Sequence, residues 1–157
     1  MRRFLPLVVI LGLALPATEA IAQGRFELGP RVGFDVANVE ELLVGAEARL
    51  PFRSQPVALQ SALDVYLPAR GSFVTLSVNV LYRFPVDHPR IRPYAGAGLG
   101  FSFYDDAAGQ NLSDTGFNLV GGLRFPSSSA FTPFVQTQVT LGTVDLIALS
   151  GGFLLDV

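Results

Sequence analysis

Apolar and polar residues alternate with a period of two along most of the chain. The clearest segment runs from Phe73 to Phe84, where every even-numbered residue is apolar and most odd-numbered residues are polar. Successive side chains of a β-strand point to opposite faces of the sheet. The pattern therefore predicts a strand with one apolar face and one mostly polar face.

The same alternation recurs in seven further segments, which are separated by short stretches rich in Pro, Gly, Ser and Asp. These segments span residues 25–36, 42–53, 57–66, 91–103, 117–125, 135–141 and 147–157. Together with residues 73–84 they make eight predicted strands, and an even number suits an antiparallel up-and-down barrel.

Alternation alone fits two kinds of barrel. In a soluble, lipocalin-like barrel the apolar face points inward, whereas in an outer-membrane barrel it meets lipid and the polar face lines the interior. The polar faces here are rich in small and amide residues and contain no lysine, which suits the narrow interior of an eight-stranded barrel. The last predicted strand also runs to Val157 with apolar residues at every odd position from Phe153. We therefore predict an all-β, eight-stranded transmembrane barrel.

The polar faces carry charges of both signs, and these must pair inside a small barrel because an unpaired buried charge is very costly. The residues of this predicted lumen charge network are Glu27, Arg31, Asp35, Glu47, Arg49, Arg53, Asp64, Arg83, Arg92, Arg124 and Asp156. A salt-bridged interior filled by side chains is the expected state, since eight strands leave little room beyond it.

Composition supports a membrane protein. Charged residues make up 15% of the 157 residues, against about 25% in a soluble domain, and the mean hydropathy is +0.44. The apolar content excludes a disordered chain, and a net charge of −2 disfavours a nucleic-acid partner. The chain contains no cysteine, which excludes disulfides and thiolate metal sites.

The N-terminus has the features of a secretory signal peptide. Arg2 and Arg3 precede an apolar run over residues 4–15, and Ala20-Ile21-Ala22 matches the small-residue cleavage pattern. We predict cleavage after residue 22 and a barrel domain over 23–157. An uncleaved anchor is the alternative, although the run is shorter than the roughly 20 residues of a spanning helix.

A recurring strand ending predicts which connections share one side of the membrane. Three predicted strands close on aromatic residues that would form an aromatic girdle, namely Phe52, Tyr82, Phe84 and Phe125. Each leads into a short connection, at 54–56, 86–90 and 127–129, which we predict to be periplasmic turns. The external loops would then lie near 37–41, 68–72, 105–115 and 142–145.

Four features of the sequence have a known parallel: the signal peptide, the eight strands, the stretch from Arg92 to Gly100 (RPYAGAGLG) and the alternating C-terminal strand. They resemble the small outer-membrane β-barrel proteins of Gram-negative bacteria, with the OmpA/OmpX-like barrels as the nearest comparison. The resemblance implies residence among outer-membrane lipid and lipopolysaccharide, assembly by the outer-membrane insertion machinery, and a monomer. Such chains usually end in Phe or Trp, whereas this one ends in Val157.

Residues that could perform chemistry are few. His88, the only histidine, has no nucleophile or second ligand near it in the sequence and is expected to be a solvated turn residue. Asp105, Asp106 and Asp114 fall in the longest loop, where a weak cation site is a less favoured alternative to a solvated loop. The glycines of residues 96–100 lie within a strand pattern, and we expect them to make room for a large partner across the lumen: Tyr66, Phe134 or an arginine. No catalytic, cofactor or metal site is predicted.

The predicted function is an integral outer-membrane barrel with a structural, adhesive or envelope-stabilising role, and not an enzyme. A small pore for hydrophilic solutes is one alternative, and it would require water continuous past Glu47, Arg49 and Arg124. A secreted, lipocalin-like carrier of an apolar ligand is the other, and it would require Val74, Leu76, Val78 and Val80 to face inward.

Overall fold

The computed structural model describes residues 26–37, 41–52, 55–67, 72–105, 111–127 and 129–157. The predicted signal peptide over residues 1–22 lies outside these residues, as does Arg53. No helix in the described ranges is long and apolar enough to cross a membrane.

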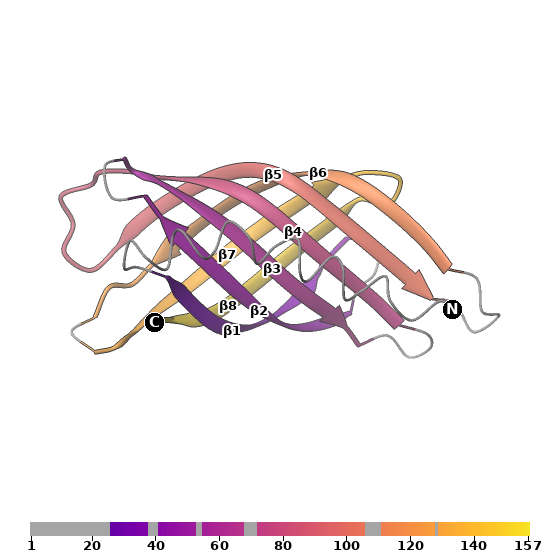
Figure 1. Ribbon diagram of the computed structural model, residues 1–157, viewed down its shortest axis with the longest axis horizontal. Coiled ribbons are helices and arrows are strands. Elements are labelled where there is room, and N and C mark those ends of the chain that lie inside the picture. Colours follow the sequence, from indigo (N-terminus) through magenta and orange to yellow (C-terminus); the bar gives the residue numbers. More distant parts are fainter. Residues whose placement is uncertain (1–25, 38–40, 53–54, 68–71, 106–110, 128) are drawn as a thin grey trace.

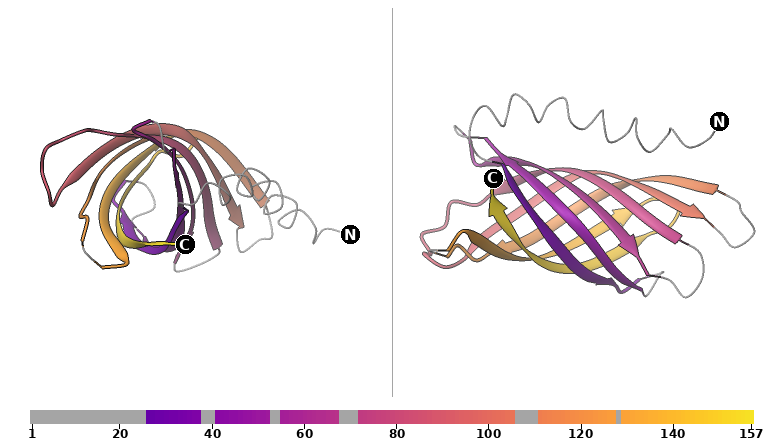
Figure 2. Two further views of the ribbon diagram at one scale, coloured as in Figure 1. Left: turned by 60° about the vertical axis from the view of Figure 1, so that its left-hand side comes forward. Right: turned by 60° about the horizontal axis from the view of Figure 1, so that its bottom comes forward.

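Eight strands follow one another along the chain (Figure 1). Their bounds are β1 Glu27–Asp35, β2 Leu42–Pro51, β3 Val57–Tyr66, β4 Ser72–Arg83, β5 Arg92–Asp105, β6 Asn111–Arg124, β7 Phe131–Leu141 and β8 Leu146–Asp156. Each strand pairs antiparallel with the next, and β8 pairs with β1, so the sheet closes into a barrel (Figure 2). Closure leaves no strand with an unpaired edge. The predicted eight-stranded antiparallel fold is confirmed.

The two ends of the barrel differ in their connections. The turn end holds the start of β1 and the end of β8, whose Glu27 and Asp156 are register partners, together with the connections β2–β3, β4–β5 and β6–β7. The loop end holds the connections β1–β2, β3–β4, β5–β6 and β7–β8. This is the grouping that the repeated strand endings predicted.

The apolar face of every strand points out of the barrel. Val32, Val80 and Leu149 expose 61%, 54% and 56% of their surface, whereas Arg31 and Ser150 beside them in the chain are buried. All charged strand residues occupy inward-facing positions except Asp105, the last residue of β5. A lipocalin-like carrier requires the opposite facing, so the structure contradicts that alternative.

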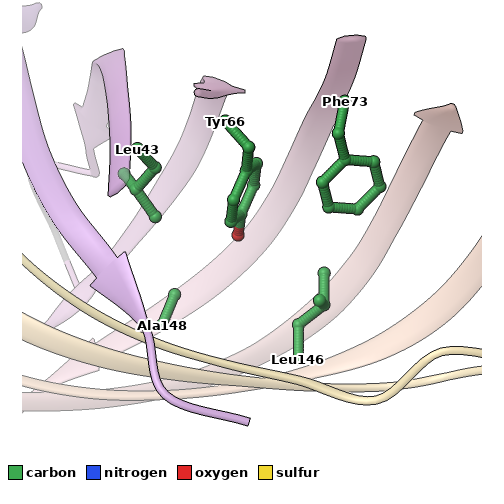
Figure 3. Close-up of a cluster of buried hydrophobic side chains, with 5 residues drawn as sticks. All are labelled: Leu43, Tyr66, Phe73, Leu146 and Ala148. Atoms are coloured by element: carbon green, nitrogen blue, oxygen red, sulfur yellow. The ribbon is translucent and has the colours of Figure 1, made fainter. Parts of the chain in front are cut away.

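Apolar side chains fill the lumen near the loop end. This loop-end plug consists of five buried residues that converge from β2, β3, β4 and β8 (Figure 3): Leu43, Tyr66, Phe73, Leu146 and Ala148. The rings of Tyr66 and Phe73 lie 4.7 Å apart between centroids. The interior is therefore polar along only part of its length.

The glycines of β5 make room for neighbours in the same sheet. A Cβ added to Gly96 would meet Leu81, one added to Gly98 would meet Asn79, and one added to Gly100 would meet Asn118. These partners stand on the adjacent strands β4 and β6, so the expectation of Tyr66, Phe134 or an arginine across the lumen was wrong. A missing side chain frees space first beside itself, where the next strand is only about 4.8 Å away.

Replacing Gly98 by Ala is expected to destabilise the barrel by about 1–3 kcal/mol, because the new methyl would press on the Val78 carbonyl and the Asn79 side chain. Gly121→Ala is the matched control, since a Cβ there has nothing within 4 Å. Urea unfolding of both variants in lipid vesicles measures the two free energies of unfolding. Equal stability of the two variants would contradict the close packing inferred at Gly98.

Candidate functional site

Four charged side chains from β1, β2 and β3 meet in the middle of the lumen. Arg31 Nη1 donates to Glu47 Oε2 at 3.0 Å, and Arg31 Nε lies 3.0 Å from Asp64 Oδ1. Arg49 Nε also donates to Glu47. All four side chains are at most 3% exposed, so two cations and two anions balance in a space that excludes bulk water.

Arg49 extends this cluster to the far wall of the barrel. Its guanidinium lies over the rings of Tyr94 and Phe134, at 4.4 and 4.9 Å from their centroids, in cation–π geometry. Its Nη2 donates to the Tyr94 hydroxyl at 2.7 Å and to Gln136 Oε1 at 3.3 Å. The Tyr94 hydroxyl in turn donates to Gln136 Oε1 at 2.9 Å. One arginine of β2 thus connects to β5 and β7.

A chain of amide side chains, ended by one hydroxyl, continues from Gln136 of β7 across the lumen to β3, β4 and β6. Gln60 donates to Gln136 at 2.8 Å, and Asn79 donates to Gln60 at 2.9 Å. Asn118 donates to Asn79 at 3.0 Å, and the Thr140 hydroxyl donates to Asn118 at 2.8 Å. We call the whole set the central network: Arg31, Glu47, Arg49, Gln60, Asp64, Asn79, Tyr94, Asn118, Gln136 and Thr140.

The remaining residues of the predicted lumen charge network lie toward the two ends. At the turn end Arg124 Nη2 lies 2.6 Å from Glu27 Oε1, and both side chains are largely buried. At the loop end Asp35 accepts backbone N–H groups from Ile147 at 2.9 Å and from Ala37 at 3.1 Å. Asp35 therefore ties the start of β8 to the end of β1.

Three further charges of the prediction occupy the rim of the turn end. Arg83 Nη2 donates to the carbonyl of Gln55, in the β2–β3 connection, at 3.2 Å. Arg92 and Asp156 are exposed, and Asp156 is the register partner of Glu27. The central network thus contains Arg31, Glu47, Arg49 and Asp64 of the predicted set, and the others stand outside it.

The predicted girdle residues also lie at the turn end. Phe52, Tyr82 and Phe84 are 50%, 44% and 44% exposed, and Phe125 is partly exposed. The Tyr82 and Phe84 rings meet edge to face at 5.2 Å between centroids. Rings that point outward beside the turns have the position that an interfacial aromatic girdle requires.

Period-two alternation assigns Gln60, Asn79, Tyr94 and Gln136 to the polar, inner faces of their strands but gives them no partners. Tyr94 is 45 residues and Gln136 87 residues from Arg49 along the chain. Period-two alternation determines the face of a residue and contains no information about which inner residues meet. The available signal was the presence of long polar side chains on the predicted inner faces.

The other chemistry-bearing residues make local contacts. His88 is exposed, and its Nδ1 accepts the N–H of Arg90. Asp114 accepts N–H groups from Thr143 and Val144 and the Thr143 hydroxyl, so it holds the β7–β8 connection. The described residues contain no group of three or more His, Asp or Glu side chains that could hold a metal ion.

Replacing Glu47 by Gln is expected to destabilise the barrel by about 3–5 kcal/mol, because it leaves Arg31 and Arg49 buried with only one carboxylate between them. Glu41→Gln is the matched control, since Glu41 lies in the β1–β2 connection outside the barrel wall. Urea unfolding in lipid vesicles measures both changes. If the two variants have the same free energy of unfolding, the buried charges contribute nothing to the stability of the barrel.

Neither a protein-family model nor a curated protein matches the sequence. Solved structures do match. The N-terminal β-barrel domain of Pseudomonas aeruginosa OprF has a TM-score of 0.71 at 17% identity, covering 85% of this chain and 98% of that one. Neisserial surface protein A has a TM-score of 0.61 at 13% identity, with 85% and 96% covered.

The outer-membrane enzyme PagL is also similar, with a TM-score of 0.55 at 12% identity, covering 83% of this chain and 99% of that one. Identities this low establish a shared fold, and PagL shows that the fold can carry an enzyme. The closed barrel, its outward apolar face and these likenesses agree. The chain has the fold of the small eight-stranded outer-membrane β-barrel proteins.

Proposed function

We propose that the protein is an integral outer-membrane barrel with a lumen closed by its own side chains, serving the envelope in a structural or adhesive role and not as a solute channel. The observation that carries this proposal is the central network, which joins Arg49 of β2 to Tyr94 of β5 and Gln136 of β7 across the lumen. The loop-end plug adds a second, apolar closure.

The outer surface supports a position within lipid. The strands are 9 to 14 residues long, and a tilted transmembrane strand needs about 9–11. Outward-facing strand positions are apolar along most of their length, and charges lie inside. Exposed apolar area is unfavourable in water. Contact with lipid tails removes this apolar surface from water, so the barrel is more stable in a membrane.

The lumen argues against the pore alternative. Eight strands enclose a space that side chains can fill, and here Arg31, Glu47 and Arg49 occupy its middle while fully or almost fully buried. A continuous water column would have to separate these charges from their partners. The loss of paired, desolvated charges makes that opening costly.

The proposed partners follow from the membrane position. Lipid would cover the apolar belt, and lipopolysaccharide would meet the loop end. The insertion machinery would act on the chain during assembly, and a closed sheet without free edges supports a monomer. A non-enzymatic role remains part of the proposal.

Replacing Val78 by Arg tests the membrane position. Val78 lies in the middle of β4 on the outward face, between Ser61 and Leu99 of the neighbouring strands. An arginine at the bilayer midplane costs about 2–4 kcal/mol, so we expect less folded protein in outer-membrane fractions and a smaller fraction resistant to unheated SDS. Val78→Leu is the control and should match the wild type. A fully neutral Val78→Arg would contradict a lipid-facing β4.

Conductance in planar lipid bilayers tests the closed lumen. The purified barrel is expected to produce no stable ion-conducting steps in 1 M KCl, because the central network and the loop-end plug fill the path. A porin measured in the same bilayers is the positive control. Reproducible steps from barrels that resist unheated SDS would favour the pore alternative instead.

A further inference from the structure

The turn end of the lumen contains a cavity outside the central network. Its volume is about 460 Å³. Residues of five strands and of three turns line it: Glu27, Pro56, Arg83, Phe84, Pro85, Val86, Arg92, Arg124, Pro126 and Thr132. The lining residues Arg92 and Thr132 stand two positions before Tyr94 and Phe134 on the same inner faces. The cavity therefore begins one layer beyond the rings that hold Arg49.

The charge of this cavity is strongly positive. Arg83, Arg92 and Arg124 line it, and Glu27 is the only acidic residue among the lining residues that the structure describes. The lining thus carries a net charge of +2. Asp156 is the register partner of Glu27 but does not belong to the lining.

The arginines come from three adjacent strands. Arg92 of β5 and Arg124 of β6 are register partners, and Arg83 of β4 is the register partner of Tyr94, two residues after Arg92. Arg124 forms an ion pair with Glu27 through its Nη2. Its buried Nε has no hydrogen-bond partner among the described residues. Like charges on neighbouring strands repel one another, so an anion between them would relieve the repulsion and supply acceptors.

We infer that this cavity binds a phosphate group. A phosphate monoester carries about −1.5 to −2 charges near pH 7 and three acceptor oxygens, which matches the net +2 and the several guanidinium donors of the lining. Guanidinium groups recognise phosphate with paired N–H donors. The apolar residues Pro85 and Val86 of the lining would surround the less polar part of a phosphate ester. The inference holds whether or not the lumen is closed to solutes.

The phosphate group could belong to a free phosphate or to a lipid headgroup, and two titrations separate these sources. Isothermal titration calorimetry on the purified barrel in a non-ionic detergent uses inorganic phosphate in one arm and short-chain phosphatidic acid, whose headgroup is a phosphate monoester, in the other. Saturable binding in the first arm supports a free phosphate ligand. Saturable binding confined to the second arm, and sensitive to the same variants, assigns the site to a headgroup.

Arg92→Gln is the main variant, since the Arg92 side chain is exposed and its replacement leaves the buried interior intact. The loss of a charge-assisted hydrogen bond predicts at least about tenfold weaker binding, and Arg83→Gln with Arg92→Gln should abolish it. Arg90→Gln is the matched control, because Arg90 lies in the same turn region and is absent from the lining. It should change the affinity less than about twofold.

Several results would overturn the inference. These are the absence of saturable binding in both arms, an equal loss of affinity in Arg90→Gln, or acetate binding as tightly as phosphate. Folding of each variant is checked by its resistance to unheated SDS. If the double variant does not fold, Arg92→Gln alone decides the result.

Discussion

Closure of eight strands into one barrel is the constraint on which the rest of the structure depends. It satisfies every backbone edge, but it leaves an interior scarcely wider than the side chains that fill it. Polar residues on the inner faces must therefore bond to one another and not to bulk water. Arg49 illustrates the result: one guanidinium is held by Glu47, by two aromatic faces and by the Tyr94 hydroxyl.

The facing of the strands could be predicted from the sequence, whereas the contacts within the lumen could not. Alternation identifies the inner face because the two sides of a strand meet different surroundings, so Glu47 and Asp64 were placed inside correctly. Their meeting with Arg31 depends on the tilt and stagger of three strands, which alternation does not encode. The glycines of β5 show the same limit, since the space beside Gly98 was correctly expected but assigned to the wrong neighbour.

The side chains of the interior differ along the barrel axis. In each layer the free-energy cost of burying them is offset in a different way. At the loop end the side chains of Leu43 and Phe73 need no hydrogen-bond partners and close the lumen by packing. In the middle, opposite charges balance and the amides share donors and acceptors. At the turn end three arginines face one glutamate, and the balance is lost where the cavity opens. A bound anion would restore the charge balance among the described lining residues.

The central network also resolves an ambiguity that alternation leaves open. A slip of one residue between two strands would turn an entire polar face toward lipid, so the in-out pattern forbids it. A slip of two residues keeps every side chain on its correct face and is not forbidden by the pattern. Applied between β1 and β2, it would, however, move Arg31 of β1 out of line with Asp64 of β3, both of which are now aligned with Gly45, and so break that buried ion pair. Because breaking a buried pair is costly, the network selects one register among those that the apolar belt permits.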